Sequence, residues 1–238
     1  MSFGVFAMTF SIVCLSPELR HGADPDTLTD NLRRIETAWH AVGAPSTRVV
    51  LLPSGGLTGG AGFATQAAAS AAVAPLCAWA KSAEICIGGA ERIDGRLQGF
   101  LVAPHADDAT WQASIADGFA TEVAVLESSA GKIACLPGAD ILHPEYVRLA
   151  LFAGAEIILN PTDERSDDRS HARHYARGAR AWENIAVVAT CAAASTSAVG
   201  RSVQEVWNHT GHLSVSGDGS AAAALIDLNT LRTRRAEP

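Results

Sequence analysis

The chain has 238 residues, of which 48% are hydrophobic and 18% charged, and this composition fits one soluble domain over residues 1–238 with a substantial core. Its formal net charge of -7 at pH 7 argues against a nucleic-acid partner and against an anionic membrane surface, because both are bound by clusters of Lys and Arg.

The cysteines and the first residues bear on the compartment. Five cysteines are scattered along the chain, mostly within apolar runs and without metal-ligand spacing, which indicates buried free thiols in a reducing environment. The apolar run 3–14 lacks the basic start and the small-residue cleavage site of a signal peptide, so it is interpreted as the first strand. No apolar stretch of the sequence reaches the roughly 20 residues of a membrane span. We therefore expect a cytoplasmic protein.

Helices and strands alternate in the first part of the chain. Residues 26–40 are predicted to form a helix, because their apolar side chains recur at helical spacing. The run 48–53 is continuously apolar, which is typical of a strand buried on both faces. Residues 62–82 are rich in alanine and predict a second helix.

A β-hairpin is predicted next. An apolar strand at 84–89 leads to an Asp-Gly turn at 94–95, and the strand returns over 100–104. We interpret residues 105–118 as a loop that ends before another strand at 122–126.

The middle of the chain predicts a β-turn-α-β unit. The strand 133–137 is followed by a turn of small residues, and a Pro-Glu start opens a helix over 144–153. A second apolar run at 157–159 ends at Asn160 and Pro161. The turn lies at the carboxyl end of a strand, where open α/β sheets place their chemistry.

The last third predicts a helix, a strand and a closing hairpin. The helix covers 174–184 and the strand 185–190, and the hairpin strands follow at 200–207 and 212–215. A final strand is expected over 221–227.

A polar segment precedes that helix. His171 and His174 lie among acidic residues in 163–174, a composition that occurs at metal sites but is more common in solvated loops. We therefore expect no metal and no cofactor.

Several of these motifs together resemble the nitrilase superfamily of carbon–nitrogen hydrolases. The matching residues lie at turns, helix starts and strand ends, and they are Pro53, Thr58, Gly59, Asp140, Pro144, Glu145, Gly154, Ala155, Glu156, Asn160, Pro161, Arg180, Ala181, Glu183 and Asn184. The resemblance covers most of the chain. It implies an α/β fold, an αββα four-layer sandwich in which the four helices predicted above lie outside two sheets.

The resemblance fails at the catalytic positions. In relatives a Glu acts as the base, a Cys as the nucleophile, and a Lys stabilises the oxyanion. Here the equivalent positions are Ser54 for the Glu, Gly138 for the Cys, and Ala103, at the start of a lysine-free loop, for the Lys. The chain has two lysines, Lys81 and Lys132, and neither matches the family position.

Three functional interpretations remain open. The first is a nitrilase-like protein without the catalytic triad, which acts as a partner subunit or binds a small molecule in a pocket lined by Asp140, His143, Asn160 and Pro161. The second is a carbon–nitrogen hydrolase of amidase type with altered active-site residues, which would reuse Ser54, Asp140, His143 or His105. The third is an active amidase with Cys135 as nucleophile, although Cys135 lies an odd number of residues before Gly138 and an odd offset turns a strand side chain to the opposite face.

The resemblance also implies how copies assemble. Relatives form a two-fold dimer through the helices that correspond to 144–153 and 174–184, and here this surface would include Glu145, Leu149 and Trp182. We expect a homodimer, or a heteromer with an active relative.

Overall fold

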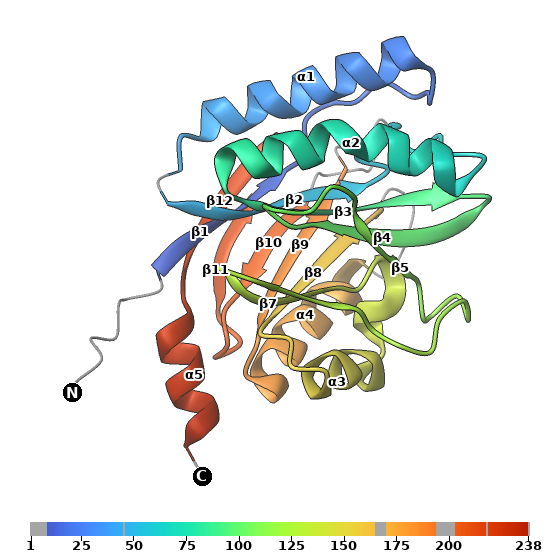
Figure 1. The fold of residues 1–238 in the computed structure, drawn as a ribbon. Helices are drawn as coiled ribbons and strands as arrows, with labels where there is room; N and C mark the ends of the chain where they lie inside the picture. Colours follow the sequence, from blue (N-terminus) through green and yellow to red (C-terminus); the bar gives the residue numbers. More distant parts are fainter. Residues whose placement is uncertain (1–8, 45, 165–169, 194–202, 218, 238) are drawn as a thin grey trace.

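Two sheets stack face to face with helices on both outer sides (Figure 1). The computed structural model describes residues 9–44, 46–164, 170–193, 203–217 and 219–237. Within these ranges each sheet has six strands, and the layers follow the order helices, sheet, sheet, helices. The predicted αββα sandwich is therefore confirmed.

The first sheet has its parallel strands at the centre and antiparallel strands at its edges. Its order is β12 (Ala221–Asp227), β1 (Thr9–Leu15), β2 (Thr47–Ser54), β3 (Cys86–Ile93), β4 (Arg96–Val102) and β5 (Thr110–Ala113). Strands β1, β2 and β3 run parallel to one another. Helices α1 (Pro25–Val42) and α2 (Gln66–Ala83) cover its outer face.

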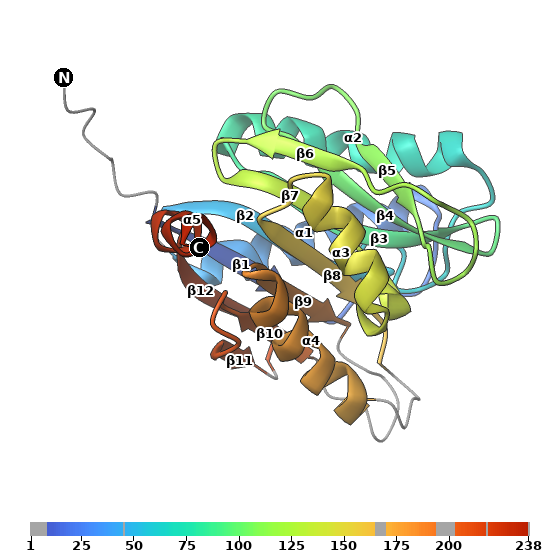
Figure 2. The same ribbon diagram turned by 90° about the horizontal axis from the view of Figure 1, so that it is seen from below.

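The second sheet repeats this plan. Its order is β11 (Leu213–Gly217), β10 (Val203–Trp207), β9 (Val187–Ala192), β8 (Ile157–Thr162), β7 (Gly131–Cys135) and β6 (Val125–Ser128). Helices α3 (Pro144–Phe152) and α4 (Ser170–Asn184) cover its outer face and lie side by side (Figure 2). No helix in the described ranges is long and apolar enough to cross a membrane.

Local sequence signals explain several element boundaries. The Asp24 side chain caps α1 by accepting a hydrogen bond from the amide of Thr27, and the helix ends at Gly43 in the left-handed conformation. Asp94 and Gly95 both have positive φ, as the tight turn between β3 and β4 requires. The predicted hairpin is thus confirmed.

Several elements differ from the sequence predictions: α2 begins at Gln66 rather than at 62, and β6 covers Val125–Ser128 rather than 122–126. Strand β5 lies within residues 105–118, which we had interpreted as a loop, and α4 begins at Ser170 rather than at 174. A C-terminal helix, α5 (Leu228–Ala236), was not predicted. The predicted strand segments 3–8 and 200–202 lie outside the described residues.

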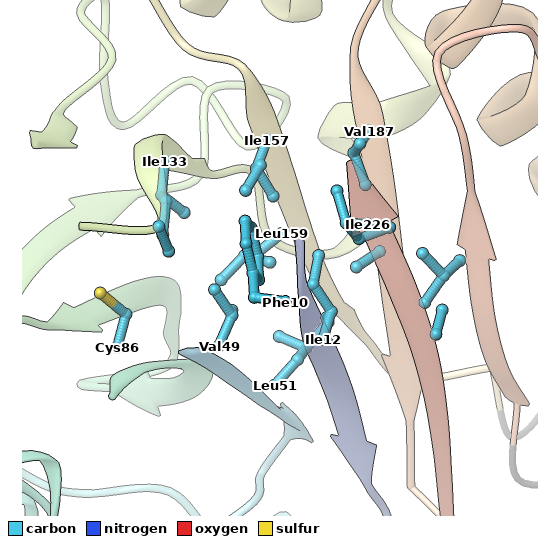
Figure 3. Packing of buried hydrophobic residues seen from close by; sticks show 14 of the residues in the cluster. Phe10, Ile12, Val49, Leu51, Cys86, Ile133, Ile157, Leu159, Val187 and Ile226 are labelled. Atoms are coloured by element: carbon cyan, nitrogen blue, oxygen red, sulfur yellow. The ribbon is translucent and has the colours of Figure 1, made fainter. Parts of the chain in front are cut away.

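The core between the two sheets is built from aliphatic side chains of both layers (Figure 3). Leu51 of β2 and Leu159 of β8 are fully buried in it. The sheets approach so closely that a Cβ on Gly88 would lie 2.5 Å from a methyl carbon of Leu159. Glycine at this position therefore sets how near β3 and β8 can come.

Replacing Leu159 by alanine should destabilise the protein by about 2–5 kcal/mol, because it removes buried methyl groups and leaves a cavity between the sheets. Leu225→Ala is the matched control: Leu225 also lies on a strand but is 65% exposed, so its loss should cost no more than about 0.5 kcal/mol. Urea unfolding of both variants measures the difference. Equal midpoints would show that the interface between the sheets does not carry the stability assigned to it.

Candidate functional site

The turn after β7 is fixed from β8. Asn160 is fully buried, and its amide group donates hydrogen bonds to the carbonyl oxygens of Leu136 at 2.7 Å and Gly138 at 3.1 Å. Thr190 of β9 donates in turn to the Asn160 side-chain oxygen at 3.4 Å. Asn160 therefore positions the backbone at the place where the family resemblance puts the nucleophile.

A side chain at Gly138 would meet a strained backbone angle and one neighbouring methyl group. The φ of Gly138, +59°, lies in the left-handed region, where L side chains are strained. A Cβ built on Gly138 would also lie 2.7 Å from a methyl carbon of Leu97, which is itself 7% exposed. A side chain at position 138 would therefore require this methyl group of Leu97 to shift.

Ser54 lies in the same region, at the end of β2 (Thr47–Ser54). Its strand partner is Ala90, whose partner in β4 is Gly99. A Cβ on Gly99 would lie 3.4 Å from the ring of Pro137, the residue before Gly138. The residues paired side by side across the first sheet, Ser54, Ala90 and Gly99, therefore lead from Ser54 to a point next to the turn at Gly138.

The structure does not bring Ala103 to this point. Ala103 follows the end of β4, whereas Leu97, which contacts Gly138, lies near its start. Six residues of strand separate the two by about 20 Å, because each residue advances the strand by about 3.3 Å.

Gln112 of β5 pairs with Gly99, so it continues the line of paired residues that begins at Ser54. Gln112 is 6% exposed, and its amide group donates to the carbonyl oxygens of Ala113 at 2.8 Å and Glu122 at 2.9 Å. Its side-chain oxygen accepts from the amide of Ala124 at 2.7 Å. Gln112 is neutral and saturated with hydrogen bonds, so it supplies no cation. We did not identify it from the sequence because β5 was interpreted as a loop.

Asp140 ties the chain after β5 to the same turn. It is fully buried and accepts hydrogen bonds from the Ser114 hydroxyl at 2.8 Å and from the amides of Ala116 at 2.8 Å and Ile115 at 3.1 Å. Burial raises the pKa of this carboxyl above its ordinary value, although the hydrogen bonds oppose that effect. The contacts around Asp140 are those of a residue that anchors a loop.

The other predicted pocket residues divide into exposed and structural ones. His143 is exposed, caps α3 without a side-chain hydrogen bond, and has its ring centroid 4.9 Å from that of Tyr146. His105 is also exposed. Pro161 is buried within β8, in register with Cys191.

A glycine-rich turn over 55–62 leaves β2 beside Ser54. Its backbone N–H groups do not form a free anion site, because the buried side chain of Glu91 occupies them. Glu91 accepts from the amide of Leu57 at 2.6 Å and from the hydroxyl of Thr58 at 2.7 Å. The sequence signal for this contact is a glutamate that follows five small or apolar residues in β3, and we had not singled it out.

Cys135 is unsuited to act as a nucleophile. It lies fully buried between the sheets, and its sulfur is 2.5 Å from where a Cβ on Gly99 would be. Burial raises the pKa of its thiol far above the ordinary value, so the reactive thiolate does not form near neutral pH. The other four cysteines are also free and buried.

A groove lies elsewhere on the molecule, along α1. It has a volume of about 490 Å³ and lies against Pro17, Glu18 and Ser220. Neither Ser54 nor Gly138 lines it.

Apolar side chains are exposed on α3 and α4. Phe152 is 81% exposed, Tyr175 71% and Trp182 67%, and Leu149 is 38% exposed. Leu149 and Phe152 are three residues apart, and Tyr175 and Trp182 seven, so each pair lies on one face of its helix. Glu145 is exposed at the start of α3.

Comparisons with known proteins identify the fold. No protein-family model matches the chain, and no curated protein matches its sequence. Among solved structures, Nit3 of Saccharomyces cerevisiae, a member of branch 10 of the nitrilase superfamily, has a TM-score of 0.75 at 18% identity, over 95% of this chain and 93% of that one. An amidase from Nesterenkonia sp. has a TM-score of 0.72 at 19% identity, over 99% and 97% of the two chains.

A mutant of the Nesterenkonia sp. AN1 amidase carries the acetamide moiety of fluoroacetamide covalently at its active-site cysteine. It matches this chain with a TM-score of 0.71 at 20% identity, over 95% of this chain and 94% of its own. The chain therefore has the sandwich fold of the nitrilase superfamily, which is a carbon–nitrogen hydrolase type of fold.

Thiol labelling tests the state of the cysteines. Iodoacetamide at neutral pH should modify none of the five rapidly in the folded protein, because all are buried. The same protein unfolded in urea should react at all five, which provides the control. Rapid modification of Cys135 in the folded protein would identify a reactive thiol and restore the amidase interpretation.

Proposed function

We propose that this chain is a nitrilase-like protein without the catalytic triad that acts as a partner subunit through α3 and α4. The observation that carries the proposal is that two adjacent helices expose four large apolar side chains, Leu149, Phe152, Tyr175 and Trp182. Large apolar side chains exposed together on a folded protein are typical of an interaction surface.

The residues near the turn support the absence of hydrolysis. Amide hydrolysis on this fold needs an ionisable base, a thiolate and a fixed cation. Ser54 has a hydroxyl that is no base at neutral pH, Gly138 has no side chain, and the third residue of the region, Gln112, is a neutral amide. Each role lacks the group that would perform it.

Packing at the turn favours a partner subunit over a small-molecule binder. A ligand pocket requires empty space beside converging polar groups. A methyl group of Leu97 lies next to Gly138, and the hydrogen-bonding groups of Asp140 and Asn160 already bind other parts of the chain. The α3–α4 surface has no such internal partner.

A second copy of this chain is the first candidate partner. Most oligomers of soluble proteins are symmetric, and a two-fold dimer places the same surface of both copies in contact. Apolar side chains can pack against their own symmetry mates without any complementary charge. An active relative with the same sandwich is the second candidate.

The alternative of an amidase-type hydrolase with altered residues has less support. Its candidate groups do not converge, since His105 and His143 are exposed and the Asp140 carboxylate already accepts three hydrogen bonds.

We expect no turnover of simple amides, N-carbamoyl compounds or nitriles by the wild type. The double variant Ser54→Glu with Gly138→Cys should also stay inactive, because the new side chain would meet a methyl group of Leu97 and no cation faces its oxyanion; one missing oxyanion donor alone typically costs about 10²–10³ in rate. Ammonia release, measured for both proteins side by side, tests this.

Wild-type turnover would contradict the absence of hydrolysis. If Ser54→Ala abolished it, Ser54 would belong to an active site with altered chemistry. If Cys135→Ala abolished it, the buried thiol would be the nucleophile.

The double variant Phe152→Asp with Trp182→Glu should convert an assembled protein to monomer, because two charges would be buried at the contact. Sedimentation velocity at micromolar concentration measures the change. Leu225→Asp is the control, since Leu225 is an exposed apolar residue on β12, away from both helices. A wild type that stays monomeric, and that binds no triad-containing relative, would overturn the proposal.

A further inference from the structure

Glu91 holds the glycine-rich turn with both carboxylate oxygens. Oε1 accepts from the amides of Leu57 at 2.6 Å and Thr58 at 3.3 Å, and Oε2 accepts from the Thr58 hydroxyl at 2.7 Å. The turn is the segment that follows Ser54. Glu91 is 0% exposed, so its contact with the turn excludes solvent.

The same turn is joined to α1 and to the loop before it. Asn31 of α1 donates to the carbonyl oxygen of Leu57 at 2.8 Å, and the amide of Gly22 donates to the carbonyl oxygen of Thr58 at 2.9 Å. A change at Glu91 therefore acts on a turn that links the first sheet to its covering helix.

Among the residues that the structure describes, no cation is paired with the Glu91 carboxylate. The turn has no titratable side chain, the strand partner in β4 is the neutral Gln98, and α1 contributes the neutral Asn31. The charged or titratable residues of the adjacent segments are exposed to solvent, and they are Arg20, His21, Arg92 and Asp94. Burial of a carboxylate without a cation disfavours its ionised form.

We propose that Glu91 is a protonation-dependent latch: its protonated carboxyl holds the turn 55–62 against β3, and ionisation toward neutral pH favours local opening of the turn. The proton comes from solvent. When Glu91 is protonated, its Oε2–H can donate to the Thr58 oxygen, while both backbone amides continue to donate to Oε1. This inference does not depend on the proposed partner function.

The direction follows from the two states. Burial raises the pKa of Glu91 to about 7 in the closed state, against 4.5 for an ordinary glutamate carboxyl that an opened turn exposes to water. The stabilisation of the closed state is complete below pH 4.5 and is lost as pH rises through about 7. The opening constant should thus increase on the order of 100-fold across this window.

Amide hydrogen exchange at Leu57 and Thr58 tests the latch, with rates corrected for the intrinsic pH dependence. In the wild type the protection of both amides should fall on the order of 100-fold between pH 4.5 and 7. Glu91→Gln should show no such fall, because its amide reproduces the protonated carboxyl at every pH. Glu84→Gln removes an exposed glutamate just before β3 and should keep the wild-type profile.

Constant protection in the wild type, or the same fall in Glu91→Gln, would overturn the proposal. If Glu91→Gln does not fold, carbon-13 NMR of the wild-type side-chain carboxyl gives the answer directly. A midpoint near 7 supports the latch, and a midpoint near 4.5 refutes it.

Discussion

The close approach of the two sheets is the constraint on which the rest of the structure depends. Gly88 faces Leu159, and Gly99 faces Cys135, at separations that leave no space for a further carbon atom. Because cores pack at near-crystalline density, these glycines and the bulky residues opposite them must be considered as pairs. The same close packing continues to the end of the strands, where Leu97 meets Gly138. The packing at the turn is thus an extension of the core.

Much of the fold could be predicted from the sequence because its signals are local. The Asp-Gly turn at 94–95, the capped helix α1 and the Pro-Glu start of α3 each depend on a few neighbouring residues. Strand β5 lacks such a signal, whereas helix α5 has one that we did not use: the Asp227 side chain accepts from the amides of Asn229 and Thr230. β5 is a four-residue strand defined by pairing with β4, and α5 is held by Arg232, which binds both carboxylate oxygens of Glu156, 76 residues away in sequence.

The positions of the candidate site that lie at or just after the end of a strand could be predicted from the sequence. Ser54 and Gly138 were chosen from motifs; Ser54 is the last residue of β2, and Gly138 begins a short 3-10 helix three residues after the end of β7. Ala103 was assigned by its position in the chain, whereas the register selects Gln112. Leu97 carries no sequence signal for its contact with Gly138, since that contact arises only when the two sheets are stacked.

The pairing of β1 with β12 has a consequence for synthesis. β1 lies near the start of the chain and β12 near its end, and the two run antiparallel along seven residue pairs at one edge of the first sheet. A nascent chain emerges from the ribosome with β1 long before its partner exists. Until then β1 presents unpaired amide and carbonyl groups along that edge, which are a template for pairing with another chain. The first sheet is therefore completed only when β12 has been synthesised. A chain released before that point would expose the unpaired edge of β1 and could aggregate through it.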